Sequence, residues 1–365
     1  MRFEFFPSRT LTAYLSKLFF IRIAAMLAVL VLVLMALDLL STSGNILAVE
    51  GNGQAQLWTY VTLRVPQLIA RFLPYSVLLA TIIALIGLNQ NSEVIAMKAA
   101  GLSAHQVLAP LLLTAGLVSI ASFAFNERVV THATATLSAW EANDFGPIPE
   151  DTGIRSNVYL TDGENILAAS TITGSGDAMI MNGVTFYRRN AQDMLVEQIR
   201  ADRAIYAAPG WQLTDATSFE AQTAETTRID TVTVGADISP AQVELSTVNA
   251  DAQSLWQLSQ SIADFAAAGR RTTELRAKWW HKISGPLSAF LMPLLGAVAA
   301  FGLARSGQLF VRALIGMGLG FTYFVVDNAA LAMGNFGGYP PFLAAWAPFF
   351  LFLLIGETVL VRTEE

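Results

Sequence analysis

The chain has 365 residues, of which 54% are hydrophobic and only 14% are charged. This composition is more apolar and poorer in charge than that of an average soluble protein, so it indicates a membrane protein. A net charge of −6 does not suggest a nucleic-acid-binding surface, and the absence of cysteine excludes disulfides, thiolate zinc sites and cysteine nucleophiles.

Six apolar segments are long enough to cross a bilayer, which requires about 20 residues of helix. The predicted spans are residues 18–40, 68–89, 106–126, 283–304, 310–332 and 341–361. The first is longer than the apolar region of a signal peptide and no clear cleavage site follows it, so we expect it to be retained. The sequence thus predicts a polytopic α-helical membrane protein with an insert, residues 129–275, between two membrane halves, residues 1–128 and 276–365.

The first connection is predicted from its polar residues. Ser41-Thr42-Ser43-Gly44-Asn45 is expected to end the first span, and residues 45–66 are expected to form a loop or surface helix that ends at Pro66.

Basic residues in the short connections predict the orientation. They precede the first span or flank the connection between the fourth and fifth: Arg2, Arg9, Lys17, Arg22, Arg305 and Arg312. The connection at 334–340 has none. Both termini are therefore expected in the cytoplasm and the insert on the outer side, although Arg64 and Arg71 on that side count weakly against this.

The insert shows strand patterns between about 150 and 250. Short β-type runs occur at 157–160, 184–187, 204–206, 211–213 and 231–234, and turns are expected at Asp162-Gly163, Gly174-Ser175-Gly176 and Pro209-Gly210. This spacing predicts an all-β sandwich or open roll. A helix over 127–143, stopped by Gly146, Pro147 and Pro149, is expected before it, and an amphipathic helix over 251–268, ended by Gly269-Arg270-Arg271, after it.

The connection between the second and third spans predicts a short cytoplasmic helix. Ser92 can cap it, Glu93 suits its positive end and Gly101 can close it. Val94, Met97 and Gly101 would share one face. Such a helix can lie on the membrane or fit a groove of a cytosolic partner, and periodicity alone favours the membrane.

Three polar side chains in or near the spans are candidate functional residues. Asp327 lies inside the fifth predicted span, where a carboxyl group either belongs to an internal pathway or makes a structural hydrogen bond between helices. Arg71 and Arg128 lie near the outer ends of the second and third spans. They can hold anionic head groups or extend to the membrane surface as boundary residues.

The motif Ser92-Glu93-x-x-x-Met97-x-Ala99-x-Gly101 resembles the corresponding loop of the lipopolysaccharide export permeases, the inner-membrane subunits of the Lpt transporter. Further matching motifs are Leu11-x-x-Tyr14-x-x-Lys17, Phe72-x-Pro74, Trp280-x-Lys282-x-x-x-Pro286-Leu287-Ser288, Gly320-Phe321, Val326-Asp327 and Pro340-Pro341. The likeness covers nearly the whole chain. Phe301-Gly302 with Arg305, and the Asp327 segment, resemble the G-type subunit more than the F-type.

The resemblance implies a permease subunit of an ATP-binding-cassette transporter that extracts lipopolysaccharide from the outer leaflet of the bacterial inner membrane. Residues 92–101 would form a coupling helix seated in a cytosolic ATPase dimer, which would bind ATP and Mg²⁺, while this chain would hold no cofactor or metal. The coupling residues implied are Ser92, Glu93, Met97, Ala100 and Gly101. An F-type permease would complete a heterodimer, with spans 1 and 5 of each subunit as gates.

The lipid path follows from the same resemblance. Its candidate residues in the membrane are Arg71, Phe72, Arg128, Phe321, Phe324 and Asp327. The insert would be a periplasmic β-jellyroll, with Val158, Leu160 and Phe186 inside, that passes lipid to a membrane-anchored jellyroll adaptor. Family members carry basic residues where this chain has Met35-Ala36-Leu37-Asp38 and Ser138-Ala139-Trp140-Glu141, so Arg71 or Arg128 is expected to take over part of head-group binding.

Other functions remain open at this point. A lipoprotein-extracting ATP-binding-cassette permease would have four spans, with its domain after the first. A membrane enzyme would act from Asp327 and a histidine, although His105, His132 and His281 are expected on two sides of the membrane. A scaffold would tolerate loss of Glu93. The chain lacks the GxxxxGK[ST] phosphate loop, so it is not expected to hydrolyse ATP by that route itself.

Overall fold

The computed structural model describes residues 6–147, 155–162, 165–174, 176–190, 194–221, 223–236, 238–240, 243, 249–267, 270–301 and 309–364. The chain forms two compact units, one of residues 1–41, 61–133 and 250–365, and one of residues 42–60 and 134–249. Several residues named above lie outside the described ones: Arg2, Pro149, Gly163, Ser175, Gly269, Gly302 and Arg305.

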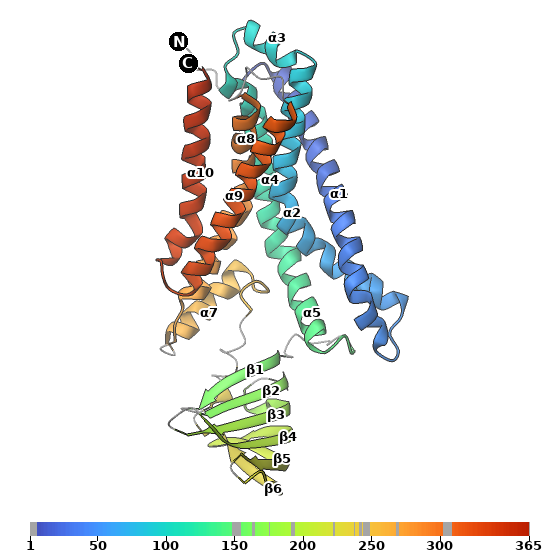
Figure 1. Ribbon diagram of the computed structural model, residues 1–365, viewed down its shortest axis with the longest axis vertical. Coiled ribbons are helices and arrows are strands. Elements are labelled where there is room, and N and C mark those ends of the chain that lie inside the picture. Colours follow the sequence, from blue (N-terminus) through green and yellow to red (C-terminus); the bar gives the residue numbers. More distant parts are fainter. Residues whose placement is uncertain are drawn as a thin grey trace. The chain divides into compact units, whose positions relative to one another are not determined.

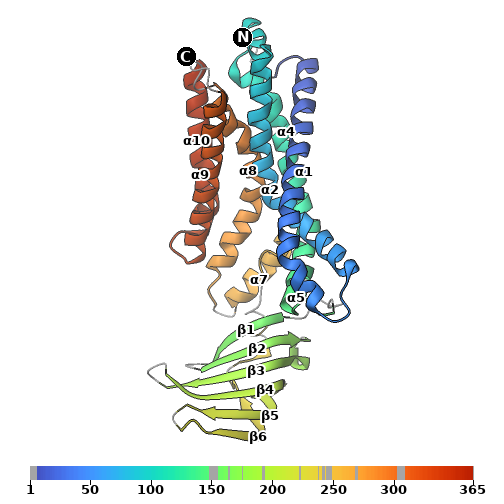
Figure 2. The same cartoon turned by 45° about the vertical axis from the view of Figure 1, so that its right-hand side comes forward.

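Long helices make up the first unit and run side by side (Figure 1). They are α1 (Arg9–Ala48), α2 (Gln54–Gln90), α4 (Ala104–Phe125), α8 (Thr273–Phe301), α9 (Leu309–Asn335) and α10 (Pro341–Glu364). The turn η1 (Asn126–Val130), a π-helix, continues α4 into α5 (Thr131–Ala142). Figure 2 shows α8, α9 and α10 as neighbours.

Five helices of the described chain are long and apolar enough to cross a membrane. They are Arg9–Ala48, Gln54–Gln90, Ala104–Glu141, Leu314–Asn335 and Pro341–Arg362. These five coincide with predicted spans. The remaining prediction, 283–304, lies in α8 as far as Phe301, and its last residues fall outside the described chain.

The polar residues from Ser41 onward do not stop the helix as predicted. Helix α1 continues to Ala48, and within it the Ser41 hydroxyl donates to the Asp38 carbonyl oxygen at 2.7 Å. The chain turns instead at Gly51, which adopts a φ of +91°. Helix α2 then passes through Pro66, so the predicted boundary there is also wrong.

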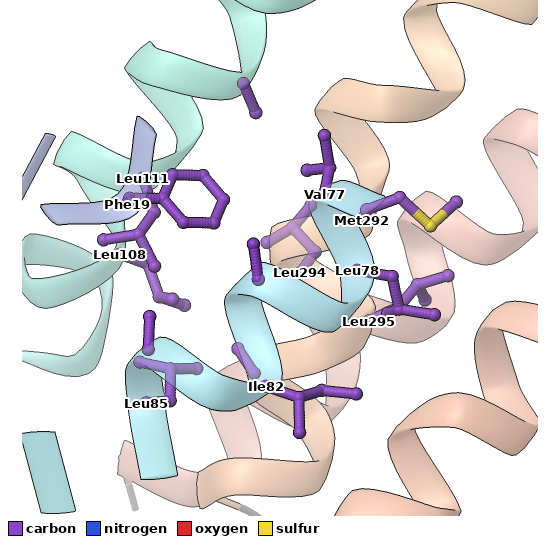
Figure 3. Close-up of a cluster of buried hydrophobic side chains, with 14 of the residues drawn as sticks. Phe19, Val77, Leu78, Ile82, Leu85, Leu108, Leu111, Met292, Leu294 and Leu295 are labelled. Atoms are coloured by element: carbon purple, nitrogen blue, oxygen red, sulfur yellow. The ribbon is translucent and has the colours of Figure 1, made fainter. Parts of the chain in front are cut away.

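The core of the helical unit lies where α1, α2, α4 and α8 meet (Figure 3). Its central side chains are Phe19, Val77, Leu78, Ile82, Leu85, Leu108, Leu111, Met292, Leu294 and Leu295. Glycines let further helices approach closely. A Cβ on Gly296 of α8 would lie 2.7 Å from the Thr81 side chain, and one on Gly320 of α9 would lie 2.1 Å from that of Leu78. Backbone-to-side-chain packing of this kind is typical of membrane helices.

Helix α1 belongs to this core on one side only. Leu15, Phe19 and Ile23 are buried, whereas Leu32 is 70% exposed and Leu40 is 77% exposed. The outer surface of α1 is therefore a long apolar face.

The insert contains one antiparallel sheet of six strands. They are β1 (Arg155–Asp162), β2 (Asn165–Thr173), β3 (Ile180–Arg189), β4 (Leu195–Ala207), β5 (Gly210–Glu220) and β6 (Thr226–Val234), each paired with the next in sequence. All five predicted strand runs lie in these strands. This sheet confirms the predicted antiparallel β-structure of the insert, whereas its arrangement as a sandwich, an open roll or a jellyroll stays a prediction. The predicted return helix is α7 (Leu255–Ala267).

One face of the sheet is apolar and buried, because inward and outward side chains alternate along each strand. Trp211 is fully buried there, and its Nε1–H donates to the Ile238 carbonyl oxygen at 2.9 Å. The turn predicted at Pro209-Gly210 joins β4 and β5, with Pro209 in the turn and Gly210 as the first residue of β5. At the other predicted turn, Gly174 has a φ of +83°.

Candidate functional site

The short helix α3 (Glu93–Ala99) lies between α2 and α4, where the sequence predicted it. Its predicted cap is wrong: Ser92 has a φ of 60° and its side chain makes no capping hydrogen bond. Capping requires an extended backbone at this position, and the left-handed Ser92 lacks it. Gly101 does close the helix, with a φ of +84° and hydrogen bonds from Gly101 N to Lys98 O and from Leu102 N to Met97 O.

The two faces of α3 differ sharply. Val94 and Met97 are buried in the core of the helical unit, with 6% and 7% exposure. On the opposite side Ile95 is 62% exposed, and Ala96, Ala99, Ala100 and Gly101 are exposed with it. Gly101 therefore does not share the buried face as predicted. Met97 is buried and anchors the helix, and the accessible surface combines the apolar Ile95 and several small residues with the exposed Lys98.

A tyrosine of α1 reaches the first residue of α3. The Tyr14 hydroxyl donates to the Glu93 carboxylate, at 3.2 Å from Oε2 and 3.5 Å from Oε1. The two residues are 79 positions apart in the chain. Sequence reasoning placed Tyr14 in a motif but assigned it no contact, and pattern alone carries no signal for this pairing.

Further polar contacts fasten α1 to its other neighbours. The Ser16 hydroxyl donates to the Pro110 carbonyl oxygen of α4 at 3.2 Å. The Arg22 guanidinium donates to the Ile83 carbonyl oxygen of α2 at 2.9 Å, beside Gly87, where a Cβ would lie 3.1 Å from it.

An ion pair joins α1 and α2 further along. Arg64 Nη2 lies 2.9 Å from Asp38 Oδ1, and its Nε lies 3.2 Å from Oδ2, so the guanidinium holds the carboxylate with two hydrogen bonds. The Arg64 Nη1–H donates to Gln67 Oε1 at 2.9 Å. Asp38 thus pairs with Arg64 within the helical unit.

The candidate lipid-path residues do not form one surface. Phe324 of α9 stacks on Tyr75 of α2, with ring centroids 3.8 Å apart, and Phe72 lies 5.7 Å from Tyr75. Phe321 instead points outward with 64% exposure, and Asp327 is buried. Arg71 and Arg128 are exposed. The structure therefore brings together Phe72 and Phe324 through Tyr75.

Asp327 faces a histidine across the contact of α8 and α9. Its Oδ2 lies 3.9 Å from His281 Nε2, while His281 Nδ1 lies 3.5 Å from the Ser284 hydroxyl. These separations are longer than those of good hydrogen bonds, and Ser284 is 2% exposed. The arrangement offers no accessible nucleophile at Ser284, so it gives little support to an enzyme built on Asp327 and a histidine.

Trp140, within the stretch 138–141, has a packing role. Trp140 is fully buried, its Nε1–H donates to the Gly146 carbonyl oxygen at 2.8 Å, and its ring lies 5.3 Å from Phe145. Asn52 donates to the Phe145 carbonyl oxygen at 2.8 Å. The turn between α1 and α2 is thereby held to the end of α5.

Val158, Leu160 and Phe186 all lie on the buried face of the sheet. They are 3%, 7% and 3% exposed and belong to one apolar cluster. In the register of β1, β2 and β3, Leu160 is opposite Leu167, which in turn is opposite Phe186. The three predicted interior residues thus contribute to the same apolar surface.

Apolar helices around a buried core, with a β-sheet inserted between the third and fourth long helices, define a polytopic membrane protein with an extramembrane insert. Residues 13–362 match the family model of the lipopolysaccharide export system permease LptF/LptG. The chain belongs to this family, as the motif resemblance predicted.

Two proteins of similar sequence belong to the same family. The lipopolysaccharide export system permease protein LptG of Escherichia coli K12 is 25% identical over 315 residues, covering 83% of this chain and 84% of the relative. LptG of Haemophilus influenzae is 24% identical over 324 residues, covering 86% of this chain and 89% of the relative. Both carry the name of the G-type subunit, in agreement with the predicted likeness.

Proposed function

We propose that this chain is the G-type permease subunit of an ATP-binding-cassette transporter that extracts lipopolysaccharide from the inner membrane and delivers it toward the outer membrane. The observation that carries the proposal is the family match over residues 13–362. Its partners would be an F-type permease, a cytosolic ATPase dimer that binds ATP and Mg²⁺, and a periplasmic jellyroll adaptor anchored in the membrane.

In this proposal α8 is a transmembrane helix with the other five. It contacts α4, α9 and α10, and Leu291, Met292 and Leu295 in it are fully buried. Six spans put both termini in the cytoplasm and the insert in the periplasm, as the basic residues of the short connections favour. Arg64, although paired with Asp38, still counts weakly against this orientation, because the rule counts basic residues rather than net charge.

The ATPase would dock on the exposed face of α3. Ile95 is the large apolar side chain of that face, and Glu93 lies at its edge. An apolar anchor bordered by small residues and by the basic Lys98 suits a helix seated in a groove. Because Glu93 also accepts the Tyr14 hydrogen bond, movement of α3 would reach α1 directly as well as through the buried Val94 and Met97.

Lipid transfer requires a covered apolar route, since each CH₂ exposed to water costs about 0.8 kcal/mol. The exposed apolar faces of α1 and α9, the latter including Phe321 and Val325, would line such a route with the F-type subunit. The apolar face of the sheet, completed as a jellyroll, would continue it in the periplasm. Arg71 and Arg128, both exposed, would bind phosphates of the head group.

Charge reversal on α3 tests the proposal. Glu93→Lys should abolish co-purification of the ATPase or reduce lipid-dependent ATP hydrolysis at least tenfold, because it places a cation at the positive helix end and at the docking edge. Glu50→Lys, at an exposed carboxylate in the turn between α1 and α2, is the matched control and should behave as wild type. Normal assembly and transport in Glu93→Lys would contradict the docking assignment.

The identity of the cargo is tested separately by analysing lipid bound to the purified wild-type complex. Lipopolysaccharide supports the proposal, whereas a lipoprotein or another lipid would favour a permease of different specificity. Turnover of a substrate by the purified chain without an ATPase would favour a membrane enzyme.

A further inference from the structure

Glu127 joins two segments of the chain that are 128 residues apart. It lies in the π-turn η1, and its Oε2 accepts a hydrogen bond from the backbone N–H of Leu255, the first residue of α7, at 2.7 Å. Segment η1–α5 leads into the insert, and α7 follows it. A lone glutamate near a helix end carries no motif, so sequence reasoning gave it no role.

The π-turn is unusual in its own right. Such turns hold one residue more than an α-helical turn, interrupt the regular hydrogen bonding, and occur often at functional positions. Here the Thr131 hydroxyl donates to the Glu127 carbonyl oxygen at 2.9 Å, which supplies a local partner within the turn. The Glu127 carbonyl oxygen thus has a partner within the turn, while the Glu127 side chain bonds to α7.

Helix α7 has a cap of its own. The Ser254 hydroxyl accepts from Gln257 N at 3.3 Å, and the Gln257 side chain accepts from Ser254 N at 2.9 Å. This reciprocal pair is a capping box, which suffices to start a helix. The Glu127 carboxylate adds a charge-assisted bond at the positive helix end. Its contribution is therefore to fix where α7 lies rather than whether α7 forms.

The same returning segment is fastened to α8 by separate contacts. Lys278 Nζ lies 3.1 Å from Asp251 Oδ2, and the Trp279 Nε1–H donates to the Ser259 hydroxyl at 2.8 Å. Lys282 interacts electrostatically with the carboxylates of both Glu127 and Asp251. Figure 1 shows α7 beside the first turns of α8. Through Glu127, the segment that leads into the insert is tied to this assembly.

We propose that Glu127 is a positioning residue that makes the segments entering and leaving the β-sheet insert move as one with α8. We call the hydrogen bond between Glu127 and Leu255 the tie. Its consequence rests on the proposed function: the tie would align the insert for lipid delivery, whereas ATP hydrolysis by the partner would not depend on it. Loss of the tie would separate ATP consumption from lipid transfer.

The tie is tested first in the isolated full-length chain. Cysteines introduced by Val129→Cys in η1 and Ala263→Cys in α7, both at exposed positions of a cysteine-free protein, allow two spin labels to be attached. Glu127→Leu, which removes the acceptor, should broaden the distance distribution between them. Glu127→Gln keeps an acceptor oxygen and should give an intermediate result. Ser254→Ala weakens the cap of α7 without touching the tie and should leave the distribution narrow.

The consequence is tested in the assembled complex. Lipid delivered per ATP hydrolysed should fall about tenfold in Glu127→Leu, the order of magnitude of losing one charge-assisted hydrogen bond, with hydrolysis unchanged. Ser254→Ala should deliver normally. A narrow distribution in Glu127→Leu, or the same defects in Ser254→Ala, would overturn the inference. The spin-label measurement needs neither lipid nor ATPase, so it decides on the tie even if the proposed function fails.

Discussion

Gly334 in α9 has no side chain, and α10 packs closely against it. A Cβ at this residue would lie 2.3 Å from Ala344 Cβ, an atom that cannot rotate away because it is attached directly to the backbone. Gly318 in the same helix has no atom within 4 Å of the equivalent position. Gly334→Ala and Gly318→Ala therefore add the same methyl group, the first where a neighbouring helix occupies the space and the second where the space is empty.

The structure sets the size of the effect. Carbon atoms in contact are about 3.5–4.0 Å apart, so Gly334→Ala requires α9 and α10 to separate by roughly 1.2–1.7 Å. Overpacking of this kind costs about 1–3 kcal/mol. Gly318→Ala meets no obstacle and should gain up to about 0.5–1 kcal/mol, because alanine favours the helix over glycine.

Thermal unfolding of the purified chain in one detergent measures both changes. Gly334→Ala should lower Tm by several degrees, and Gly318→Ala should leave it equal or higher. Adding Ala344→Gly to Gly334→Ala moves the methyl group from one helix to the other and should recover most of the loss. Wild-type Tm in Gly334→Ala, or no recovery in the double variant, would refute the close approach of these helices.

Polar contacts of α1 and the exposed face of α3 give three further predictions. Asp38→Arg or Arg64→Asp alone should destabilise the chain by about 1 kcal/mol, a modest value because both side chains are partly exposed, and the double swap should restore Tm. Tyr14→Phe should weaken lipid-dependent ATP hydrolysis several-fold by removing one hydrogen bond, and should have no further effect once Glu93→Ala, which removes the acceptor, is present. Ile95→Asp should prevent co-purification of the ATPase without changing Tm, since the side chain is exposed.

The helices and the β-sheet were predictable because their signals are local. An apolar run of membrane length and the alternation of apolar and polar residues in a strand can each be read within one segment. The end of α1 was not predictable in this way. Ser41 is compatible with either a loop or a helix, and its hydroxyl bonds to the Asp38 carbonyl oxygen within the helix that forms.

The site was predicted as a segment but not in its contacts. The position of α3 and its closure at Gly101 follow from short-range rules. Periodicity correctly placed Val94 and Met97 on one face. The resemblance implied a coupling role for Met97, and only the structure shows that this side chain is buried. Contacts such as Tyr14 with Glu93 and Glu127 with Leu255 join residues distant in the chain, so without the three-dimensional structure nothing indicates which partner each selects.

The attachment of α1 has a mechanical consequence. Apolar side chains such as Phe19 pack this helix into the core, and directional bonds, from Arg22 to a carbonyl oxygen and from Asp38 to Arg64, add to that packing. Apolar contacts tolerate small changes of rotation and height, whereas these directional bonds re-form at only one rotation and one height of the helix. If α1 moves away from its neighbours and returns, these bonds bring it back to the same rotation and height.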